Sequence, residues 1–397
     1  MSESIESIEE FTEAHVVRVV TECIEQEATR IAKLVESSLR ERDKKSLRDL
    51  IGNERIRKVS LNPRLKNLCS VAVDTSFTTP PLELTGGKLV LIVRGHVLYG
   101  NCSAACIPRS DAKGYVKFIQ ESEGIATPLS KIIERKFIIE LLEKKLEHKA
   151  FFDLIILDGE LFPRVPPGFI KRSKESVSLR IKLYGRLIEL TSKMLRLADK
   201  TDTALVGILK RAYGSDLAII LRKPNIRLND KVLASYVLSN GEYIVLGSYA
   251  DLYDDLLRLV KDESIDIPAS LRRTLNEKAS WLRASIRYVD HVDSINLVLY
   301  KGITPSYFTL ATKAEVYVSS ILMLDDIVSY LSMTTGVNGV PYPVDVVDSL
   351  CRITSNLLFN AQQQLFKELS ERLGDSKLAM AIAGLTNPEK MYKIGIK

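Results

Sequence analysis

The N-terminal part of the chain has the hydrophobic pattern of a helix. Apolar residues recur every three or four positions between runs of Glu, Lys and Arg, at Val16, Val17, Val20, Ile24, Ile31, Leu34 and Leu39. This spacing predicts helix over residues 5–58. We therefore expect an N-terminal helical segment at 1–60, followed by a larger domain at 61–397.

Several short apolar runs then predict buried strands. The first is NLCSVAVDTSF at 67–77, and two more, LVLIV at 89–93 and HVLYGN at 96–101, are predicted to be joined by a turn at Arg94-Gly95. The continuous apolar run FFDLIILDGELFPR at 151–164 is typical of a central strand. Further strands are predicted at TALVGILKR (203–211) and, within 283–318, at SIRYVDHV, INLVLY and AEVYVSS.

Helical patterns lie between these strands. Residues 129–148 have apolar side chains on one broad face and charges opposite, and a last helix is predicted to end near residue 373. Helical insertions are expected at about 165–200 and 230–282. This order of elements favours an α/β or α+β fold with a mixed sheet and inserted helices. A doubly wound dinucleotide-binding fold is disfavoured, because the sequence has no GxGxxG.

Composition narrows the class of protein only slightly. The formal net charge of +6 is compatible with a polyanionic partner such as a nucleic acid. No apolar run reaches the length of a membrane span, and the acidic N-terminus lacks the features of a signal peptide. We expect a cytoplasmic protein with no membrane contact. The absence of a P-loop means that any ATP-driven motor must be a partner.

The five cysteines are an odd, scattered set that does not predict a disulfide framework. Cys102 and Cys106 lie four residues apart, but no second Cys or His pair is near enough in sequence to complete a zinc site. They are predicted to be small buried apolar side chains in a reducing compartment.

Two aspartates carry the candidate chemistry. Asp74 and Asp158 each come at the end of an apolar strand. If those strands are neighbours, both carboxylates lie at the same edge of the sheet, where they could bind Mg²⁺ or Mn²⁺. Metal ions held in this way can activate water for phosphodiester cleavage. The alternative is that each Asp only forms a turn or caps a helix.

The intervening helix offers three glutamates. Glu140 lies on the stripe of Ile133, Phe137 and Leu141 and is predicted to face the sheet. Glu134 borders the other apolar flank and is the reserve candidate, whereas Glu143 is predicted to be a surface charge.

Four segments in order give the chain a resemblance to a known family. VAVDTSF and LIILDGELF resemble the two strands of NurA nucleases that end in Asp-Gly-Ser, with Thr75 at the Gly position and Glu160 at the Ser position. ALVGILKR resembles the family's strand ending in Gly-x-x-Lys. GVPYPVDVVDSL (339–350) resembles its Gly-Tyr-Pro-Tyr-Pro-Leu segment and the following helix. The resemblance covers about residues 65–365.

This resemblance to an archaeal family implies a mixed sheet core like that of RNase H and Piwi proteins. It implies 5′–3′ exonuclease and single-strand endonuclease activity with Mn²⁺, or Mg²⁺ in its place. It also implies a homodimer that joins a HerA-type hexameric ATPase in DNA end resection, a step of repair by homologous recombination. Carried over by position, Asp74 and Asp158 are catalytic metal ligands, and Glu140 or Glu134 is the helix carboxylate.

The chain departs from the family at two positions. Val340 replaces the family Tyr and Asp348 replaces the family His. Val cannot donate a hydrogen bond, whereas Asp348 could bind a metal or complement a helix dipole. Two alternatives to an active nuclease therefore stay open. One is a DNA-binding or assembly subunit with weakened activity or none, and the other is a helical scaffold in which the two strand-end aspartates lie far apart.

Basic residues supply candidate DNA contacts, which would be salt-dependent and independent of sequence. Lys210 is the leading one, since a strand-end lysine near the carboxylates could neutralise a phosphate. The other candidates are Arg94, Arg211, Lys171, Arg172 and Lys174.

Overall fold

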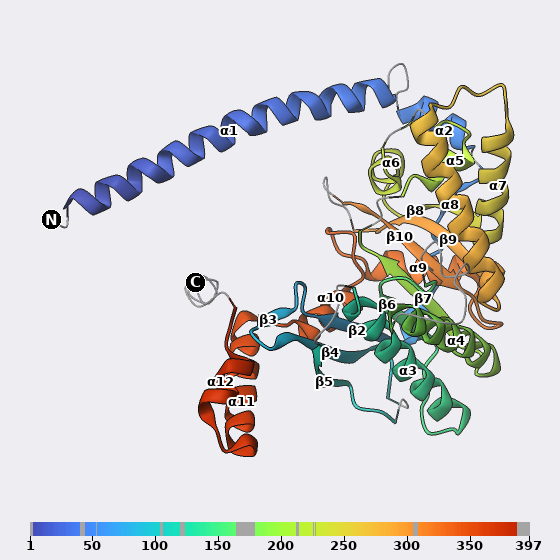
Figure 1. Cartoon of the computed structure of the whole chain (residues 1–397). Coiled ribbons are helices and arrows are strands. Elements are labelled where there is room, and N and C mark those ends of the chain that lie inside the picture. Colours follow the sequence, from blue (N-terminus) through green and yellow to red (C-terminus); the bar gives the residue numbers. More distant parts are fainter. Residues whose placement is uncertain are drawn as a thin grey trace.

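A long helix precedes a helix-covered sheet in the computed structural model (Figure 1). The structure describes residues 3–39, 44–52, 54–103, 106–119, 124–163, 179–211, 214–224, 226, 228–304 and 309–386. Helix α1, Glu3–Leu39, extends away from the body of the molecule. None of the helices in these ranges combines the length and hydrophobicity needed to cross a bilayer.

Ten strands of the described residues form one mixed sheet, in the order β1-β8-β9-β10-β7-β6-β2-β4-β3, with β5 also paired to β4. The strands are β1 Ile56–Lys58, β2 Cys69–Phe77, β3 Leu82–Leu84, β4 Gly87–Gly100, β5 Ser110–Ile119, β6 Leu154–Asp158, β7 Ala204–Leu209, β8 Glu242–Ser248, β9 Ile295–Lys301 and β10 Ala311–Tyr317. The predicted α/β fold, a mixed sheet flanked by helices, is confirmed.

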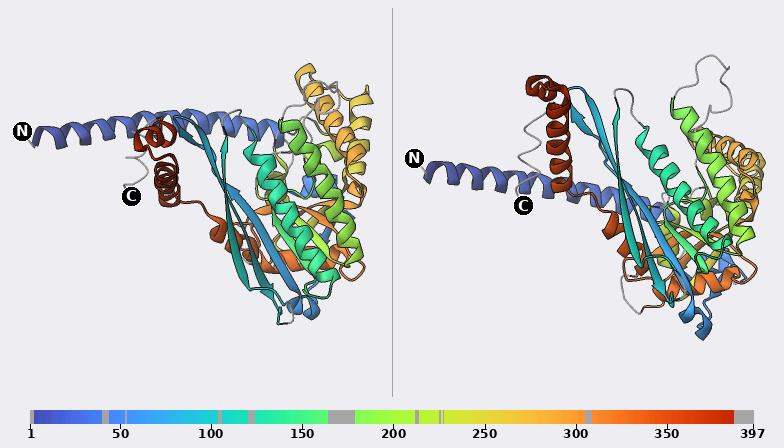
Figure 2. Two further views of the ribbon diagram at one scale, coloured as in Figure 1. Left: turned by 60° about the horizontal axis from the view of Figure 1, so that its bottom comes forward. Right: turned by 90° about the horizontal axis from the view of Figure 1, so that it is seen from below.

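Helices cover both faces of this sheet. On one face lie α2 Lys44–Ile51, α3 Ala126–Leu146, α4 Leu179–Lys200, α5 Asp216–Ile220, α6 Asp230–Val237, α7 Tyr249–Lys261 and α8 Ala269–Tyr288. On the other lie α9 Leu324–Thr334 and α10 Tyr342–Cys351, and a C-terminal pair follows, α11 Ser355–Leu373 and α12 Ser376–Ala383. Helices α3 and α4 run side by side along the first face (Figure 2).

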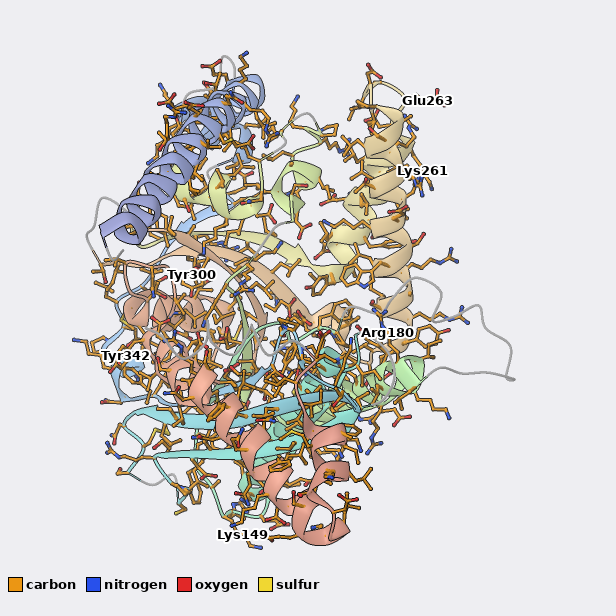
Figure 3. The ribbon with its side chains drawn as sticks, turned by 60° about the vertical axis from the view of Figure 1, so that its left-hand side comes forward. Lys149, Arg180, Lys261, Glu263, Tyr300 and Tyr342 are labelled. Carbon is orange, nitrogen blue, oxygen red and sulfur yellow. A yellow bond between two sulfur atoms is a disulfide. The ribbon has the colours of Figure 1, made fainter. Side chains whose placement is uncertain are left out.

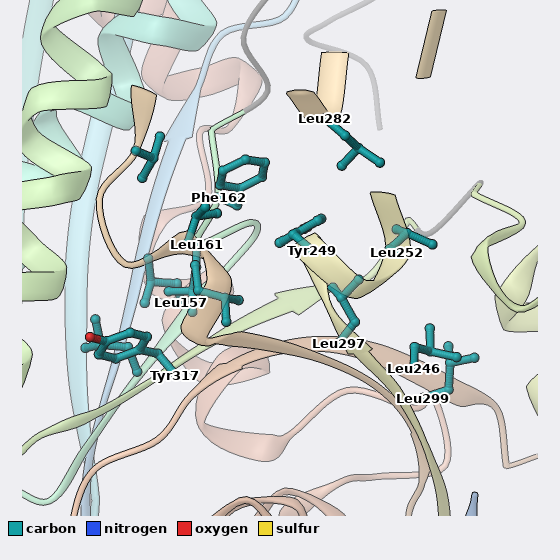
Figure 4. Close-up of a cluster of buried hydrophobic side chains, with 14 of the residues drawn as sticks. Leu157, Leu161, Phe162, Leu246, Tyr249, Leu252, Leu282, Leu297, Leu299 and Tyr317 are labelled. Atoms are coloured by element: carbon teal, nitrogen blue, oxygen red, sulfur yellow. The ribbon is translucent and has the colours of Figure 1, made fainter. Parts of the chain in front are cut away.

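The centre of the sheet is parallel and fully buried. β6 pairs in parallel with both β2 and β7, and its first four residues are inaccessible to solvent. Its side chains alternate between the two hydrophobic cores, with Leu157 facing α3 and Ile156 facing α9. Figure 4 shows Leu157 beside Leu161 and Phe162, which follow the strand and enter the same core. The prediction of a central strand here is confirmed.

The predicted turn at Arg94-Gly95 is wrong. β4 runs through both residues without interruption and pairs with β2 and β5. Gly95 is present for a different reason. A Cβ there would lie 2.7 Å from Sγ of Cys351, so the glycine allows α10 to approach the strand closely.

Three other predictions need correction. The range 5–58 is not all helix, because Ile56–Lys58 pairs with β8 as strand β1. The expected helical insertion at 230–282 contains strand β8 between α6 and α7, and this strand belongs to the sheet. The first half of SIRYVDHV, up to Tyr288, is the end of α8 rather than a strand, since its apolar residues also fit helical spacing. Residues 165–178 of the other expected insertion lie outside the described ranges.

The prediction that Cys102 and Cys106 are small buried apolar side chains is also wrong. Cys69 and Cys102 form a disulfide, with their Cα atoms 4.8 Å apart. The two residues meet because Cys69 begins β2 opposite Gly100, at the end of β4. Cys106 is exposed rather than buried. The pairing follows from strand register, which spacing between cysteines does not reveal.

Candidate metal centre at the ends of the parallel strands

Asp74 and Asp158 lie side by side on neighbouring strands. The parallel register of β2 and β6 ends at Val73 opposite Leu157, so the two aspartates are the next residues on each strand. Both side chains point to the face covered by α9 and α10, because they alternate with Val73 and Leu157, which face α3. The expectation that these strands are neighbours is confirmed.

Helix α10 brings a third carboxylate to the pair. Val347 and Cys351 of this helix pack against Ala72 of β2, which fixes the helix over the strand. Asp348 then lies beside the two aspartates, and one oxygen atom from each of the three carboxylates falls within 4.8 Å of the others. Tyr342, at the beginning of α10, is labelled in Figure 3.

Lys210 joins this cluster from the next parallel strand. It follows β7, whose Ile208 pairs with Asp158. Its ammonium nitrogen lies 2.7 Å from Oδ2 of Asp158 and 2.8 Å from Oδ2 of Asp348. Three neighbouring parallel strands and one helix therefore place all four charged groups at one edge of the sheet.

The electrostatic environment favours bound positive charge. Burial, together with the nearby carboxylates of Asp158 and Glu134, raises the pKa of Asp74 to about 7, against a hydrogen bond donated by Ser76. The pKa of Asp158 is also raised, by burial, although Lys210 opposes the shift. Crowded oxygen donors whose negative charge is incompletely balanced are the ligands that Mg²⁺ and Mn²⁺ prefer. The residues present fit a divalent cation.

The prediction that Glu140 faces the sheet is wrong. Its side chain is 55% exposed and pairs with Lys144, 3.0 Å away. The buried side of α3 is centred on Glu134, which is 1% exposed and contributes to the raised pKa of Asp74. Six residues along a helix rotate the side chain by about 120° from that centre, which carries Glu140 out to solvent.

Glu134 is the carboxylate of α3 that interacts electrostatically with Asp74, but it already has partners. Arg135 lies 2.7 Å from it and Lys131 3.4 Å. It is outside the group of three carboxylates that lie within 4.8 Å of each other. In this structure Glu134 is an ion-paired carboxylate beside Asp74, with Arg135 and Lys131 as its counter-ions.

The backbone that follows Asp158 is held by two buried charges. The guanidinium of Arg135 donates to the carbonyl oxygens of Glu160 and Leu161. The carboxylate of Glu315, on β10, accepts from the amides of Leu161 and Phe162. Arg135 and Glu315 therefore fix the direction in which the chain leaves the candidate metal centre.

Gly207 makes room for the same segment. A Cβ at this position of β7 would lie 2.6 Å from the carbonyl oxygen of Gly159 and 2.8 Å from the amide of Leu161. Both contacts are with backbone, which a side-chain rotation cannot relieve. The Gly of the ALVGILKR segment thus keeps the 159–161 backbone close against β7.

We expect Gly207→Ala to lower the free energy of unfolding by about 1–3 kcal/mol, because the backbone must shift to accept the methyl group. Gly114→Ala is the matched control, since a Cβ at this strand position meets nothing within 4 Å. The control should be neutral or stabilising by about 0.5–1 kcal/mol. Urea denaturation measures both. Equal stability of the two variants would contradict the close approach.

The other predicted DNA contacts divide into three groups. Arg94 is 8% exposed and its guanidinium lies 3.6 Å from the centre of the Phe137 ring, so the prediction that it contacts DNA is not supported by its position. Arg211 is exposed next to Lys210. Residues 171, 172 and 174 lie outside the described ranges.

Val340, which stands where the family has Tyr, is 8% exposed and packs in the core of the α9 face.

Sequence reasoning missed three residues near the centre: Lys131, Arg135 and Glu315. The available signal was a charge inside an otherwise apolar element. Glu315 stands in the buried strand β10, and Arg135 on the buried side of α3. Such residues are almost never buried without a partner, so each predicts a polar contact but not its identity.

Sequence comparisons give no match: no protein-family model matches the chain, and no curated protein does. Solved structures do match its fold. The NurA nuclease from Sulfolobus solfataricus superimposes with a TM-score of 0.54 at 11% identity, covering 90% of this chain and 97% of that one.

Two further structures are similar at lower scores. A structure of NurA with manganese has a TM-score of 0.48 at 12% identity, covering 87% of this chain and 98% of that one. A structure of NurA bound to dAMP and manganese has a TM-score of 0.43 at 13% identity, with 83% and 94% covered. The first match, which spans nearly the whole of both chains, establishes that this chain is a NurA-like protein in its fold.

Proposed function

We propose that the chain is a deoxyribonuclease that depends on a divalent metal, Mn²⁺ or Mg²⁺. The main support for this proposal is that Asp74, Asp158 and Asp348 lie close together in a NurA-like fold. The proposed activities are 5′–3′ exonuclease action on DNA ends and endonuclease action on single strands. The wide separation of Asp74 and Asp158 that would have favoured a helical scaffold is not found.

The side chains have distinct roles in this proposal. Asp74 and Asp158 hold the cation, which when bound supplies Lewis-acid activation of the scissile phosphodiester. Lys210 neutralises part of the carboxylate charge, so that a phosphate can approach. Asp348 and Lys210 are 51% and 22% exposed, so water and DNA reach the centre from their side. Arg135 and Glu315 keep the 159–162 backbone in place and do not touch the substrate.

Digestion of labelled single-stranded and linear duplex DNA tests the proposal. The wild-type protein should cleave with Mn²⁺ and stop when EDTA is added. Asp158→Asn should lower the rate by at least about 100-fold, because it removes a ligand without changing the shape of the side chain. Glu140→Gln is the matched control and should keep the wild-type rate, since Glu140 lies at the surface. Equal cleavage by wild type and Asp158→Asn would reject the proposal.

We also propose that the chain acts as a homodimer with a HerA-type hexameric ATPase in DNA end resection. Support comes from the NurA-like fold and from helix α1, which exposes an apolar series from Val16 to Ile31. Exposed apolar patches of this kind mark protein interfaces. Light scattering of the purified protein, alone and mixed with such an ATPase, measures both associations.

A second candidate function is a DNA-binding or assembly subunit without activity. Val340 favours it, because its buried side chain offers no hydroxyl where the family has Tyr. This candidate predicts salt-sensitive DNA binding, with no Mn²⁺-dependent cleavage in the assay above.

A further inference from the structure

The ammonium of Lys210 occupies a place that a metal ion could take. It lies between Asp158 and Asp348, at 2.7 and 2.8 Å from one oxygen of each. Its side chain is 22% exposed, so it turns into the cluster rather than extending into solvent. Lys231 donates a hydrogen bond to the Lys210 carbonyl oxygen, 3.2 Å away, which steadies the backbone beneath it.

A buried cluster of charges holds the following segment. Lys313 of β10 pairs with Asp216 and, at 2.8 Å, with Asp230. Asp230 begins α6, and its amide donates to the carbonyl oxygen of Gly214. Because Asp230 is inaccessible to solvent, this network ties the connection after Lys210 to the sheet. Strand β7 before Lys210 and the polar network after it therefore constrain its position.

The net charge of the centre matches the charge of one divalent cation. Asp74, Asp158 and Asp348 carry three negative charges when ionised, and Lys210 offsets one of them. The charges behind the centre balance as well, because Arg135 and Lys131 offset Glu134 and Glu160. One divalent cation balances the remaining two negative charges. A second would leave two uncompensated positive charges in a site of low polarity, which is costly before DNA binds.

We propose that Lys210 is a built-in cation that takes the place of a second metal ion, so that the centre binds one divalent ion per chain. The inference rests on the proposed function, and it specifies how that function is achieved. Nucleases with two metal ions place them about 3.5–4 Å apart, bridged by carboxylates. Here Asp158 is shared in the same way, with Lys210 on one side of it.

Mn²⁺ titration of the full-length protein without DNA tests the inference. Electron paramagnetic resonance of free Mn²⁺ and isothermal calorimetry both count bound ions. The wild-type protein should bind one equivalent per chain. Lys210→Met should bind the first ion on the order of 10-fold more tightly and accept a second, because the competing ammonium is gone. Lys210→Arg should keep one equivalent.

Arg211→Met is the matched control, because it removes the same charge from the exposed neighbouring residue. It should bind Mn²⁺ as the wild type does. Two equivalents in the wild type, or binding by Lys210→Met no tighter than by Arg211→Met, would overturn the inference. The wild-type count needs no variant, so misfolding of Lys210→Met leaves the test intact.

Failure of the proposed function gives a different result. If wild type and Asp158→Asn bind Mn²⁺ equally weakly, the chain has no metal centre and both proposals fall. If the wild type binds two equivalents and Asp158→Asn binds none, only the built-in cation is rejected.

Discussion

Asp74→Asn is expected to abolish cleavage while leaving the metal-free protein at least as stable as the wild type. The variant removes a proposed metal ligand, so the cleavage rate should fall by at least about 100-fold. It also removes a carboxylate whose ionised form is disfavoured by burial and by Asp158. Above pH 7 the gain in unfolding free energy should be on the order of 1–3 kcal/mol.

The stability difference should depend on pH with a defined sign. The pKa of Asp74 is about 7 in the folded protein and near 3.8 when unfolded, so between these values the folded state binds more protons. This group therefore makes stability fall as pH rises from about 4 to about 7. The advantage of Asp74→Asn should be absent near pH 4, grow across that window and level off above it.

Asp111→Asn is the matched control, an exposed aspartate on β5 of the same sheet. It should change unfolding free energy by less than about 0.5 kcal/mol at all pH values and keep the wild-type cleavage rate. Urea denaturation at pH 4, 5.5, 7 and 8.5 gives the profiles. A metal-free Asp74→Asn protein less stable than wild type at pH 8.5 would contradict the crowding of carboxylates.

Arg135→Met should produce the largest loss of stability. Arg135 is fully buried, and its removal leaves Glu134 without its nearest counter-ion and the carbonyl oxygens of Glu160 and Leu161 without a donor. Breaking one side of a buried ion pair costs about 3–5 kcal/mol of unfolding free energy. Methionine replaces the unbranched part of the arginine side chain, so the loss reports the guanidinium group with its charge and hydrogen bonds.

Lys136→Met is the control for this experiment, because Lys136 is the next residue on α3 and is exposed. Its unfolding free energy should stay within about 0.5 kcal/mol of the wild type. Mn²⁺ affinity should fall in Arg135→Met as well, since the backbone after Asp158 loses its anchor. If the two variants prove equally stable, Arg135 is not the anchor described here.

The parts of the site that could be predicted are those that local patterns determine. Asp74 and Asp158 each follow an apolar run, and neighbouring parallel strands bring their ends to one edge of the sheet. The same rule, applied to the next parallel strand, β7, predicts that Lys210 lies at this edge as well. Asp74, however, lies within β2 rather than at its end, because pairing with β4 continues to Phe77 after pairing with β6 has stopped.

The remainder depends on contacts between distant segments. Glu140 and Glu134 both border apolar residues, and only the packing of α3 against the sheet decides which of them is buried. Arg135 of α3 and Glu315 of β10 both contact the 159–162 backbone. Glu315 lies more than 150 residues away from that backbone in the sequence. The Cys69–Cys102 pair requires the register of β2 and β4. Single-sequence patterns contain none of this information.

The measurement that tests the central claim most directly is the anomalous difference map of a crystal grown or soaked with Mn²⁺. One strong peak per chain is expected, in contact with the carboxylates of Asp74 and Asp158, with Lys210 still beside Asp348. A map from a well-occupied soak with no peak at these aspartates, or with its peak elsewhere on the chain, would contradict the assignment of this sheet edge as a metal centre.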